Sequence, residues 1–416
     1  MSKQSTRSGR VLVTGAGGFI GHHLVQYLKG KGYWVRGVDK KLPEYGASAA
    51  DEFEVLDLRK FDNCLLATRG IDEVYGLAAE MGGIGFIEHN KAVIMRDSAL
   101  INLHMLEAAR VNGATRYLFT SSACIYPGYL QKSADVTPLK EEDAYPADAE
   151  DGYGWEKLFT ERQCRHYRED FGLETRIVRF HNIFGPLGTY DGGREKSPAA
   201  ICRKIALATD GGTIEVWGDG EQTRSYCFVE DTVEGIHRLM RSDYPHPLNL
   251  GQDRMVTINE LVDMVARIAG KTIHREHNLS APQGVRGRNS DNTKLREVLG
   301  WEPQISLEEG LRRTYAWIYG ELAKQPEKYT VQPPAPNGVP GSNGTGSKGG
   351  AKAAGKGSPK TARAEREVVL ASSPDVAAGE RAQEETDPPR PHGDKLESLI
   401  PRDGDQGATQ AVATSA

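Results

Sequence analysis

Two ionisable side chains lie four residues apart at the start of a predicted helix. Tyr153 and Lys157 form a YxxxK motif, and this spacing places the phenol and the ammonium on one face of the helix. A free tyrosine has a pKa near 10, so its use as a base near pH 7 requires roughly 4 kcal/mol of stabilisation of the phenolate. A fixed ammonium supplies part of that stabilisation. The YxxxK motif alone often occurs by chance. Its interpretation as a catalytic pair is supported by a strand about 30 residues upstream that ends in Thr120-Ser121-Ser122.

A glycine-rich turn lies between the first predicted strand and the first predicted helix. Gly15, Gly18 and Gly21 give the spacing GxxGxxG, a variant of the dinucleotide-binding fingerprint. Glycines are needed there so that the turn is tight and backbone N–H groups, including those of Phe19 and Ile20, can approach a pyrophosphate at the helix N-terminus. The turn therefore predicts a dinucleotide cofactor.

A carboxylate ends the next predicted strand. Asp39 lies 18 residues beyond Gly21, where a carboxylate binds the adenosine ribose hydroxyls and disfavours a 2′-phosphate. The sequence therefore predicts NAD in preference to NADP, although Lys40 and Lys41 weaken that preference. Asp57, which follows the third strand, is a weaker candidate for the adenine side, and a solvated loop position explains it equally well.

Short apolar runs that alternate with helical patterns must position these motifs. Strands are predicted at 10–14, 34–38, 54–56, 73–77, 117–120 and 176–180, and helices at 20–28, 92–110 and 155–171. Strands alternating with helices indicate βαβ units, and so an α/β fold with a Rossmann-type, doubly wound parallel sheet. Beyond residue 180 the rhythm becomes irregular, with further helices expected at 229–240, 258–269 and 307–322.

Composition divides the chain of 416 residues into three parts. We expect a dinucleotide-binding domain at 10–180, to which 229–243 return, and a smaller mixed α/β substrate domain at 181–328. Residues 331–416 contain no Phe, Tyr, Trp or Cys, and about a quarter of them are Pro or Gly. Such a segment cannot offset its ordering entropy, so it is predicted to be a disordered tail.

Charge and cysteine usage exclude several classes of protein. The 52 Lys and Arg against 57 Asp and Glu give a net charge of -5, which excludes an overall basic nucleic-acid binder. No apolar run of about 18 residues is available to span a bilayer. The five cysteines are scattered, with no CxxC or His/Cys cluster, so neither a metal site nor a disulfide framework is expected. The chain is predicted to be cytoplasmic with free thiols.

Further motifs place the first 325 or so residues in a known family. They are Trp217-Gly218-Asp219-Gly220, Gln222-Thr223-Arg224, Phe228-Val229-Glu230-Asp231, Asn249-Leu250-Gly251 and Leu299-Gly300-Trp301-Glu302-Pro303. With the glycine fingerprint and YxxxK, the chain resembles the extended short-chain dehydrogenase/reductase family of nucleotide-sugar epimerases and dehydratases. The resemblance implies a homodimer in which Ser122, Tyr153 and Lys157 are catalytic. NAD would take hydride from a sugar carbon, and Tyr153 would take the hydroxyl proton.

The residues after Ser122 narrow the resemblance. Cys124 lies two positions after this serine, and the segments 80–83 (EMGG) and 192–199 (GGREKSPA) accompany it. Together they resemble the branch of the family that inverts C3 and C5 of GDP-mannose, which makes GDP-mannose the expected substrate. By this resemblance Cys124 and Lys196 are the acid/base pair. The substrate-side positions are Gly82, Ser122, Cys124, Asn182, Glu195, Lys196, Lys204, Gln222, Arg224 and Arg286.

The chemistry is consistent with these residue types. Oxidation of C4 to a ketone acidifies both neighbouring carbons, and each inversion then needs one group to take a proton and another to return it. A thiol with a reference pKa of about 8.5 and an amine of about 10.4 can both shift toward neutrality near charges. Two alternatives stay open: a nucleotide-sugar 4-epimerase or 4,6-dehydratase, and a non-catalytic dinucleotide-sensing scaffold. The intact Ser122, Tyr153 and Lys157 argue against the scaffold.

Overall fold

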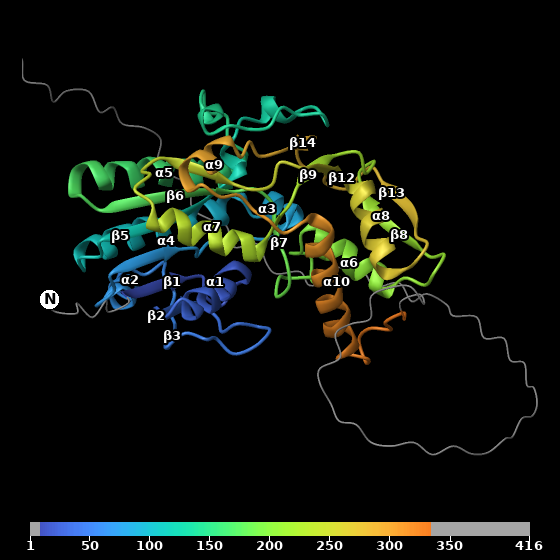
Figure 1. Ribbon diagram of the computed structural model, residues 1–416, viewed down its shortest axis with the longest axis horizontal. Helices are drawn as coiled ribbons and strands as arrows, with labels where there is room; N and C mark the ends of the chain where they lie inside the picture. The colour runs from blue at the N-terminus through green and yellow to red at the C-terminus, as the bar shows by residue number, and fades with distance from the viewer. Residues whose placement is uncertain (1–8, 334–416) are drawn as a thin grey trace, which may run out of the picture. The chain divides into compact units, whose positions relative to one another are not determined.

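Seven parallel strands form the central sheet of the computed structural model, which describes residues 9–333 (Figure 1). The order is β11-β6-β5-β4-β1-β2-β3, and every neighbouring pair is parallel. Most of these strands are buried over nearly their full length, as expected when helices cover both faces. The predicted doubly wound sheet is confirmed. Its strands are β1 (Arg10–Thr14), β2 (Trp34–Asp39), β3 (Glu52–Val55), β4 (Glu73–Gly76), β5 (Arg116–Ser122), β6 (Glu174–Phe180) and β11 (Pro247–Leu250).

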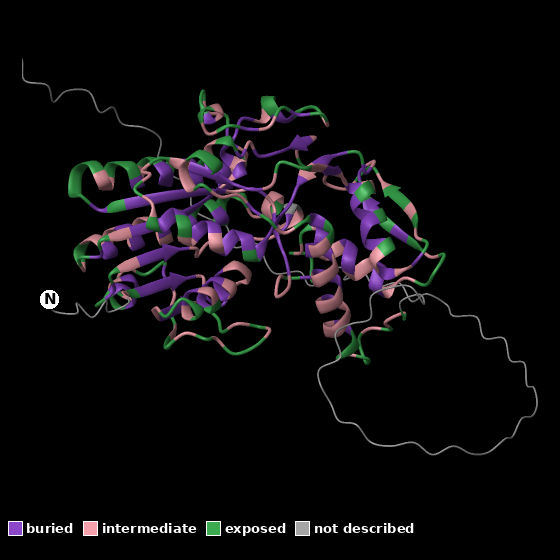
Figure 2. Cartoon of the chain, viewed as in Figure 1, coloured by how far each residue is buried: buried purple, intermediate pink, exposed green. Residues whose placement is uncertain are grey.

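Two groups of helices cover the two faces of the sheet. On one face Leu24 and Ile236 pack with Val13 of β1, and on the other Leu106 and Cys164 pack with strand residues in a separate core cluster. Figure 2 shows the inner strands of the central sheet as almost continuously buried. The first group comprises α1 (Phe19–Gly30), α7 (Val229–Arg241) and α9 (Thr293–Leu299), and the second α2 (Phe61–Thr68), α4 (Lys91–Val111) and α5 (Asp151–Phe171).

A third core cluster unites three of the helices that follow the sixth strand. It contains α6 (Ser197–Leu207), α8 (Ile258–Ala269) and α10 (Leu307–Ala323). The side chain of Thr257 caps α8 at the N–H of Glu260, which returns the bond in a capping box. Short strands pair beside these helices: β8 (Thr213–Trp217) with β13 (His274–Asn278), β7 (Ile183–Phe184) with β10 (Cys227–Phe228), and β9 (Thr223–Ser225) with β12 (Met255–Thr257) and β14 (Gly287–Arg288).

Short helices connect these elements at the ends of the strands. These short helices are α3 (Ile84–His89) and the 3-10 turns η1 (Ala123–Ile125), η2 (Gly128–Gln131) and η3 (Glu141–Ala144).

Among the residues that the structure describes, no helix is long and apolar enough to cross a membrane.

The expected tail lies almost wholly outside the described residues. Its first residues are described, and they pack on the folded part of the chain. Val331 lies against the core cluster of α6, α8 and α10, and the N–H of Gln332 donates to the carbonyl of Ala206 over 3.1 Å. The packed chain therefore continues at least to Gln332.

Candidate active site

The chemistry-bearing residues gather at the carboxyl ends of the parallel strands. Gly15 follows β1, Glu80 follows β4, Ser122 ends β5 and Asn182 follows β6. In an open parallel sheet, ligands bind outside this edge because the connecting loops diverge there. Four separate segments of the sequence are thereby brought to one place.

The glycine turn forms a close-packed cradle at the start of α1. A Cβ on Gly21 would lie 2.1 Å from the carbonyl oxygen of Gly15, and one on Gly17 would lie 2.3 Å from that of Lys41, so larger residues cannot occupy these positions. No side chain caps α1, which leaves the N–H groups of its first turn, beginning at Phe19, available for an anion. The residues present therefore fit a dinucleotide pyrophosphate.

Asp39 lies beside this cradle at the end of β2. Its carboxylate accepts hydrogen bonds from the N–H of Gly17 at 3.0 Å and of Lys41 at 3.2 Å, while burial raises its pKa. A cavity of about 60 Å³ lies here, with Gly17, Lys41 and Tyr45 among its lining residues. Both lysines that weaken the preference for NAD have carboxylate partners: Lys40 pairs with Glu80, and Lys41 lies 3.6 Å from a carboxylate oxygen of Glu44.

Asp57 has a different environment from Asp39. Its carboxylate accepts hydrogen bonds from the guanidinium of Arg59 at 2.8 and 2.9 Å, and this pairing lowers the pKa of Asp57 to about 2. The same guanidinium also donates to Asp97 on α4. Asp57 therefore stabilises the loop after β3, and its predicted contact with adenine stays a prediction.

Tyr153 and Lys157 lie on one face of α5, as the spacing predicts. The Nζ atom of Lys157 is 5.7 Å from the ring centre of Tyr153 and donates to the carbonyl of Thr120 at 2.9 Å. Burial lowers the pKa of Lys157 and raises that of Tyr153, and a hydrogen bond with Ser122 acts against the rise at Tyr153. Gly154 lets α5 approach the backbone at Cys124 closely, because a Cβ at this position would lie 2.2 Å from the carbonyl oxygen of Cys124.

Cys124 lies in the 3-10 turn that directly follows Ser122. Its N–H donates to Ser122 Oγ at 3.2 Å, and Lys196, at the start of α6, is close enough that its charge and that of Cys124 influence each other. Desolvation lowers the pKa of Lys196, although its side chain is exposed, and raises the pKa of the half-buried thiol. The thiol pKa therefore moves away from neutral pH, against the sequence-based expectation, whereas the amine pKa moves toward it.

Arg288 and Glu150 belong to this site, although neither is among the substrate-side positions expected from the sequence. Arg288 Nη1 lies 3.5 Å from Cys124 Sγ, and the same guanidinium pairs with Glu150 and donates to Gln131 Oε1 at 2.6 Å. The Glu150 N–H donates to the carbonyl of Cys124 at 2.9 Å. A second arginine two positions after Arg286, in the same short strand region, was the available signal for Arg288.

Two of the expected substrate residues stand out: Gln222 has an acceptor atom left free within residues 9–333, and Arg224 brings positive charge near the thiol. Gln222 is buried, and its Oε1 has no partner among the described residues, while its Nε2 donates to the carbonyl of Trp217 at 2.9 Å. Arg224 is close enough to Cys124 and Arg288 to interact with both, and burial lowers its pKa to about 10. Asn182 adopts a positive φ of 45° and donates to the carbonyl of Ser225 at 2.8 Å.

The other expected substrate residues are engaged with the protein. Arg286 donates twice to the carboxylate of Asp219 at 2.7 and 2.9 Å, and Lys204 donates to the carbonyl of Glu215 at 2.7 Å. Glu195 accepts from Arg203 at 3.0 Å. The carbonyl oxygen of Glu195 faces the turn at Gly82 and Gly83, and a Cβ on Gly83 would lie 2.6 Å from it.

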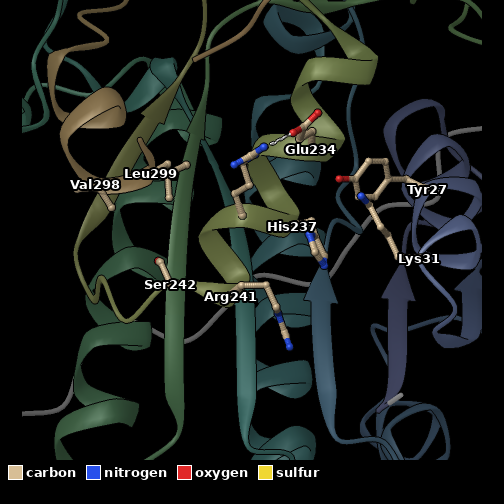
Figure 3. Close-up of a pocket in the computed structure, with 9 residues that line it drawn as sticks. Tyr27, Lys31, Glu234, His237, Arg241, Ser242, Val298 and Leu299 are labelled. Atoms are coloured by element: carbon tan, nitrogen blue, oxygen red, sulfur yellow. Dashed lines mark hydrogen bonds and ion pairs between the residues drawn. The ribbon is translucent and has the colours of Figure 1, made fainter. Parts of the chain in front are cut away.

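A second, larger cavity lies away from these residues. It measures about 400 Å³ between α1, α7 and α9, and Figure 3 shows Tyr27 and Lys31 facing His237 across it. Arg241 at its edge pairs with Glu73, the first residue of β4, which places this cavity by the amino ends of the strands. It shares no lining residue with the candidate site. Within residues 9–333, no group of three or more His, Cys, Asp or Glu side chains could hold a metal ion.

Comparison with known proteins agrees with this geometry. Residues 11–251 match the model of the NAD dependent epimerase/dehydratase family. GDP-mannose 3,5-epimerase of Arabidopsis thaliana is 50% identical over 321 residues, which cover 77% of this chain and 84% of that protein. GDP-mannose 3,5-epimerase 1 of Oryza sativa subsp. japonica is 49% identical over 318 residues, 76% of this chain and 83% of that protein. The crystal structure of UDP-glucose 4-epimerase from Thermotoga maritima with UDP-glucose aligns with a TM-score of 0.68 and 26% identity, covering 75% and 99% of the two chains.

Proposed function

The chain belongs to the NAD dependent epimerase/dehydratase family, and from this premise we propose that it inverts C3 and C5 of GDP-mannose. The product is GDP-L-galactose, with GDP-L-gulose when only C5 inverts. The observation that carries the proposal is Cys124, a thiol that adjoins Ser122 and lies near Lys196 at the same strand end. A simple 4-epimerase moves only the hydride at C4 and needs no such pair.

The cofactor is NAD, and the cradle at Gly15 to Gly21 with Asp39 would hold it. When bound, NAD takes a hydride from C4 of the sugar and returns it at the end, so no net oxidation occurs. Tyr153 takes the proton of the C4 hydroxyl. Lys157, held by the carbonyl of Thr120, stabilises the phenolate form of Tyr153 that accepts this proton, and Ser122 orients the phenol by its hydrogen bond.

Cys124 and Lys196 perform the inversions once C4 is a ketone. The ketone makes the C3 and C5 protons acidic, because each carbanion becomes an enolate. One of the two groups takes the proton, and the other returns one from the opposite face of the ring. Desolvation raises the pKa of the thiol and lowers the pKa of the amine.

The positively charged side chains near the thiol bind the nucleotide diphosphate. Arg288 is buried and Arg224 is half-buried near Cys124, where their planar donor groups suit phosphate oxygens. The unpartnered Oε1 of Gln222 is a hydrogen-bond acceptor for a base N–H donor, and guanine offers such a group. Arg286 can contact the diphosphate only if its ion pair with Asp219 breaks.

We assign the protein to a homodimer in the cytoplasm. Exposed apolar side chains occur on the paired helices α4 and α5, namely Val93, Met95, Trp155 and Phe159. A second copy of the chain would cover them, because exposed apolar groups that gather on adjoining helices favour an interface. Light scattering coupled to gel filtration tests the dimer, and the mass of a monomer would contradict it.

All five cysteines are free thiols, which suits a reducing compartment such as the cytoplasm.

The function is tested by offering the purified protein GDP-mannose and, separately, UDP-glucose. We expect proton NMR of the products to show GDP-L-galactose from GDP-mannose and no turnover of UDP-glucose. Inversion of UDP-glucose at C4, with GDP-mannose unchanged, would instead make the protein a 4-epimerase. A stable 4-keto-6-deoxy product from GDP-mannose would make it a dehydratase.

A further inference from the structure

The chain that follows α10 folds back onto one particular loop. Gln325 Nε2 donates to the hydroxyl of Tyr190 at 3.2 Å, and Lys328 Nζ donates to Asp191 Oδ2 at 3.0 Å. The hydroxyl of Tyr329 donates to the same oxygen of Asp191, and its ring lies against the core cluster of α6, α8 and α10. Three residues within one short segment thus hold two consecutive residues of the loop.

This loop carries Lys196 five residues further on. Gly192 and Gly193 separate the held residues from the catalytic lysine, with φ values of 89° and 82° that favour glycine. Nothing lies within 4 Å of a Cβ at either glycine, so packing does not restrain this part of the loop. The direction in which the loop leaves Asp191 therefore affects where Lys196 lies.

The far side of the loop has a separate attachment. Arg194 lies 3.2 Å from Glu80, its guanidinium stacks 3.8 Å from the ring centre of Phe86, and its carbonyl accepts the N–H of Gly83. Arg203 of α6 donates to the carbonyl of Tyr190 at 2.8 Å. The glycine pair thus links two held points, and the N–H of Gly193 donates to Glu195 Oε2 at 2.7 Å. The first point depends on the C-terminal segment together with Arg203, which lies 3.6 Å from Asp191 Oδ1.

We propose that Tyr329 is a positioning residue for the acid/base step, because its contact with Asp191 fixes the start of the loop that presents Lys196 to Cys124. This inference rests on the role of Lys196 in the proposed function. The Tyr329 hydroxyl is the main contact, since the Lys328 side chain is 57% exposed and a solvent-exposed ion pair contributes little. Hydrogen bonding from Tyr329 is the largest effect that lowers the pKa of Asp191, to about 2, so the carboxylate stays an acceptor at neutral pH.

The proposal predicts that Tyr329→Phe separates two steps of one reaction. Hydride transfer at C4 needs Tyr153 and Lys157, which the loop does not touch, so the NADH absorbance formed on mixing with GDP-mannose should stay within about twofold of the unaltered chain. Deuterium uptake at C3 and C5 in D2O should fall at least about tenfold, because a misplacement of about 1 Å at a catalytic group can cost up to a hundredfold. Tyr167→Phe is the matched control: it removes a hydroxyl that donates to Glu107 at 3.2 Å, far along the chain from the loop, and should change neither step.

Lys196→Ala serves as the reference that separates this inference from the proposed function. If Lys196→Ala abolishes exchange but Tyr329→Phe leaves exchange unchanged, the positioning role is wrong and the function stands. If Tyr329→Phe slows hydride transfer and exchange equally, the contact is only structural and the inference also fails. If Lys196→Ala itself exchanges normally, the proposed function has failed, and the role of Tyr329 fails with it.

Discussion

The guanidinium of Arg288 lies 3.5 Å from the sulfur of Cys124, although 164 positions separate the two residues in the sequence. Pairing of β14 with β9 brings Arg288 to the end of β5, and Glu150 pairs with the same guanidinium. Tyr153, Lys196 and Arg224 are the other ionisable groups that influence the thiol. Burial raises the pKa of Cys124 most, and two opposed neighbours, the Glu150 carboxylate and the Arg288 cation, then raise and lower it respectively.

Arg288→Met and Glu150→Gln should shift the pKa of Cys124 in opposite directions. Arg288 stabilises the thiolate, so its loss raises the thiol pKa further, whereas Glu150 opposes the thiolate, so its loss lowers the pKa. Each unit of pKa changes the thiolate fraction about tenfold at a pH below the pKa. The rate of iodoacetamide labelling at Cys124, followed against pH by peptide mass spectrometry, should fall in Arg288→Met and rise in Glu150→Gln. Shifts of the same sign in both variants would contradict this electrostatic account.

The protein should bind NAD more tightly than NADP. We expect Asp39, beside the glycine cradle, to repel a 2′-phosphate, and Lys40, which could favour that phosphate, is paired with Glu80. Asp39→Asn keeps an acceptor for the N–H of Gly17 but removes the negative charge, so it should narrow the difference between the two cofactors. Titration calorimetry with NAD and NADP measures both effects. Tighter binding of NADP by the unaltered chain would assign Asp39 another role.

Glu161→Gln should destabilise the fold strongly. Glu161 forms two hydrogen bonds with Arg179 at 2.7 and 2.9 Å and accepts from Ser121 at 2.6 Å, and both charged side chains are at most 4% exposed. Removing one charge of a buried pair leaves the other uncompensated, which typically costs about 3–5 kcal/mol. Urea denaturation should show a loss of this size. Glu169→Gln, on the exposed side of the same helix, is the control and should leave the denaturation midpoint nearly unchanged.

Two truncations should separate the packed part of the C-terminal segment from the tail. Ending the chain after Pro333 removes only residues without large aromatic groups and should leave the melting temperature nearly unchanged. Ending it after Lys328 also removes Tyr329 and Val331, which pack on the core cluster, and should cost roughly 1–2 kcal/mol. Calorimetric melting of the two shortened chains checks this. Equal melting temperatures would show that the residues 329–333 contribute nothing to stability.

Periodicity in the sequence predicted the main elements of the fold closely. The strand Arg10–Thr14 and the helix Ile258–Ala269 have the predicted bounds, because buried runs and an amphipathic helix with a capping box are strong local signals. Strand β11 was not predicted, since it has only four residues and begins with Pro247. Its place depends on pairing with β6, which is a tertiary contact that no local pattern contains.

The site was predictable where motifs carry it and unpredictable where distant segments meet. Tyr153 and Lys157 share a helix, so their spacing alone places them together. Arg288 reaches Cys124 only through the pairing of β14 with β9, and Arg286, which the sequence favoured, turns to Asp219 instead. The direction of the thiol pKa shift was also missed, because the degree of burial around Cys124 cannot be deduced from its neighbours in the sequence.

The central claim is that Cys124 and Lys196 exchange protons at C3 and C5 after oxidation at C4. The most direct measurement is NMR of GDP-mannose incubated with the protein in D2O, for the unaltered chain and for Cys124→Ala and Lys196→Ala. The account predicts deuterium at C3 and C5 and protium at C4 with the unaltered chain, because the hydride returns to C4 without meeting solvent. It predicts that each variant loses this exchange by about 10²–10⁴-fold while still forming NADH. Normal exchange at both carbons with Cys124→Ala would contradict the account and make the thiol a packing residue.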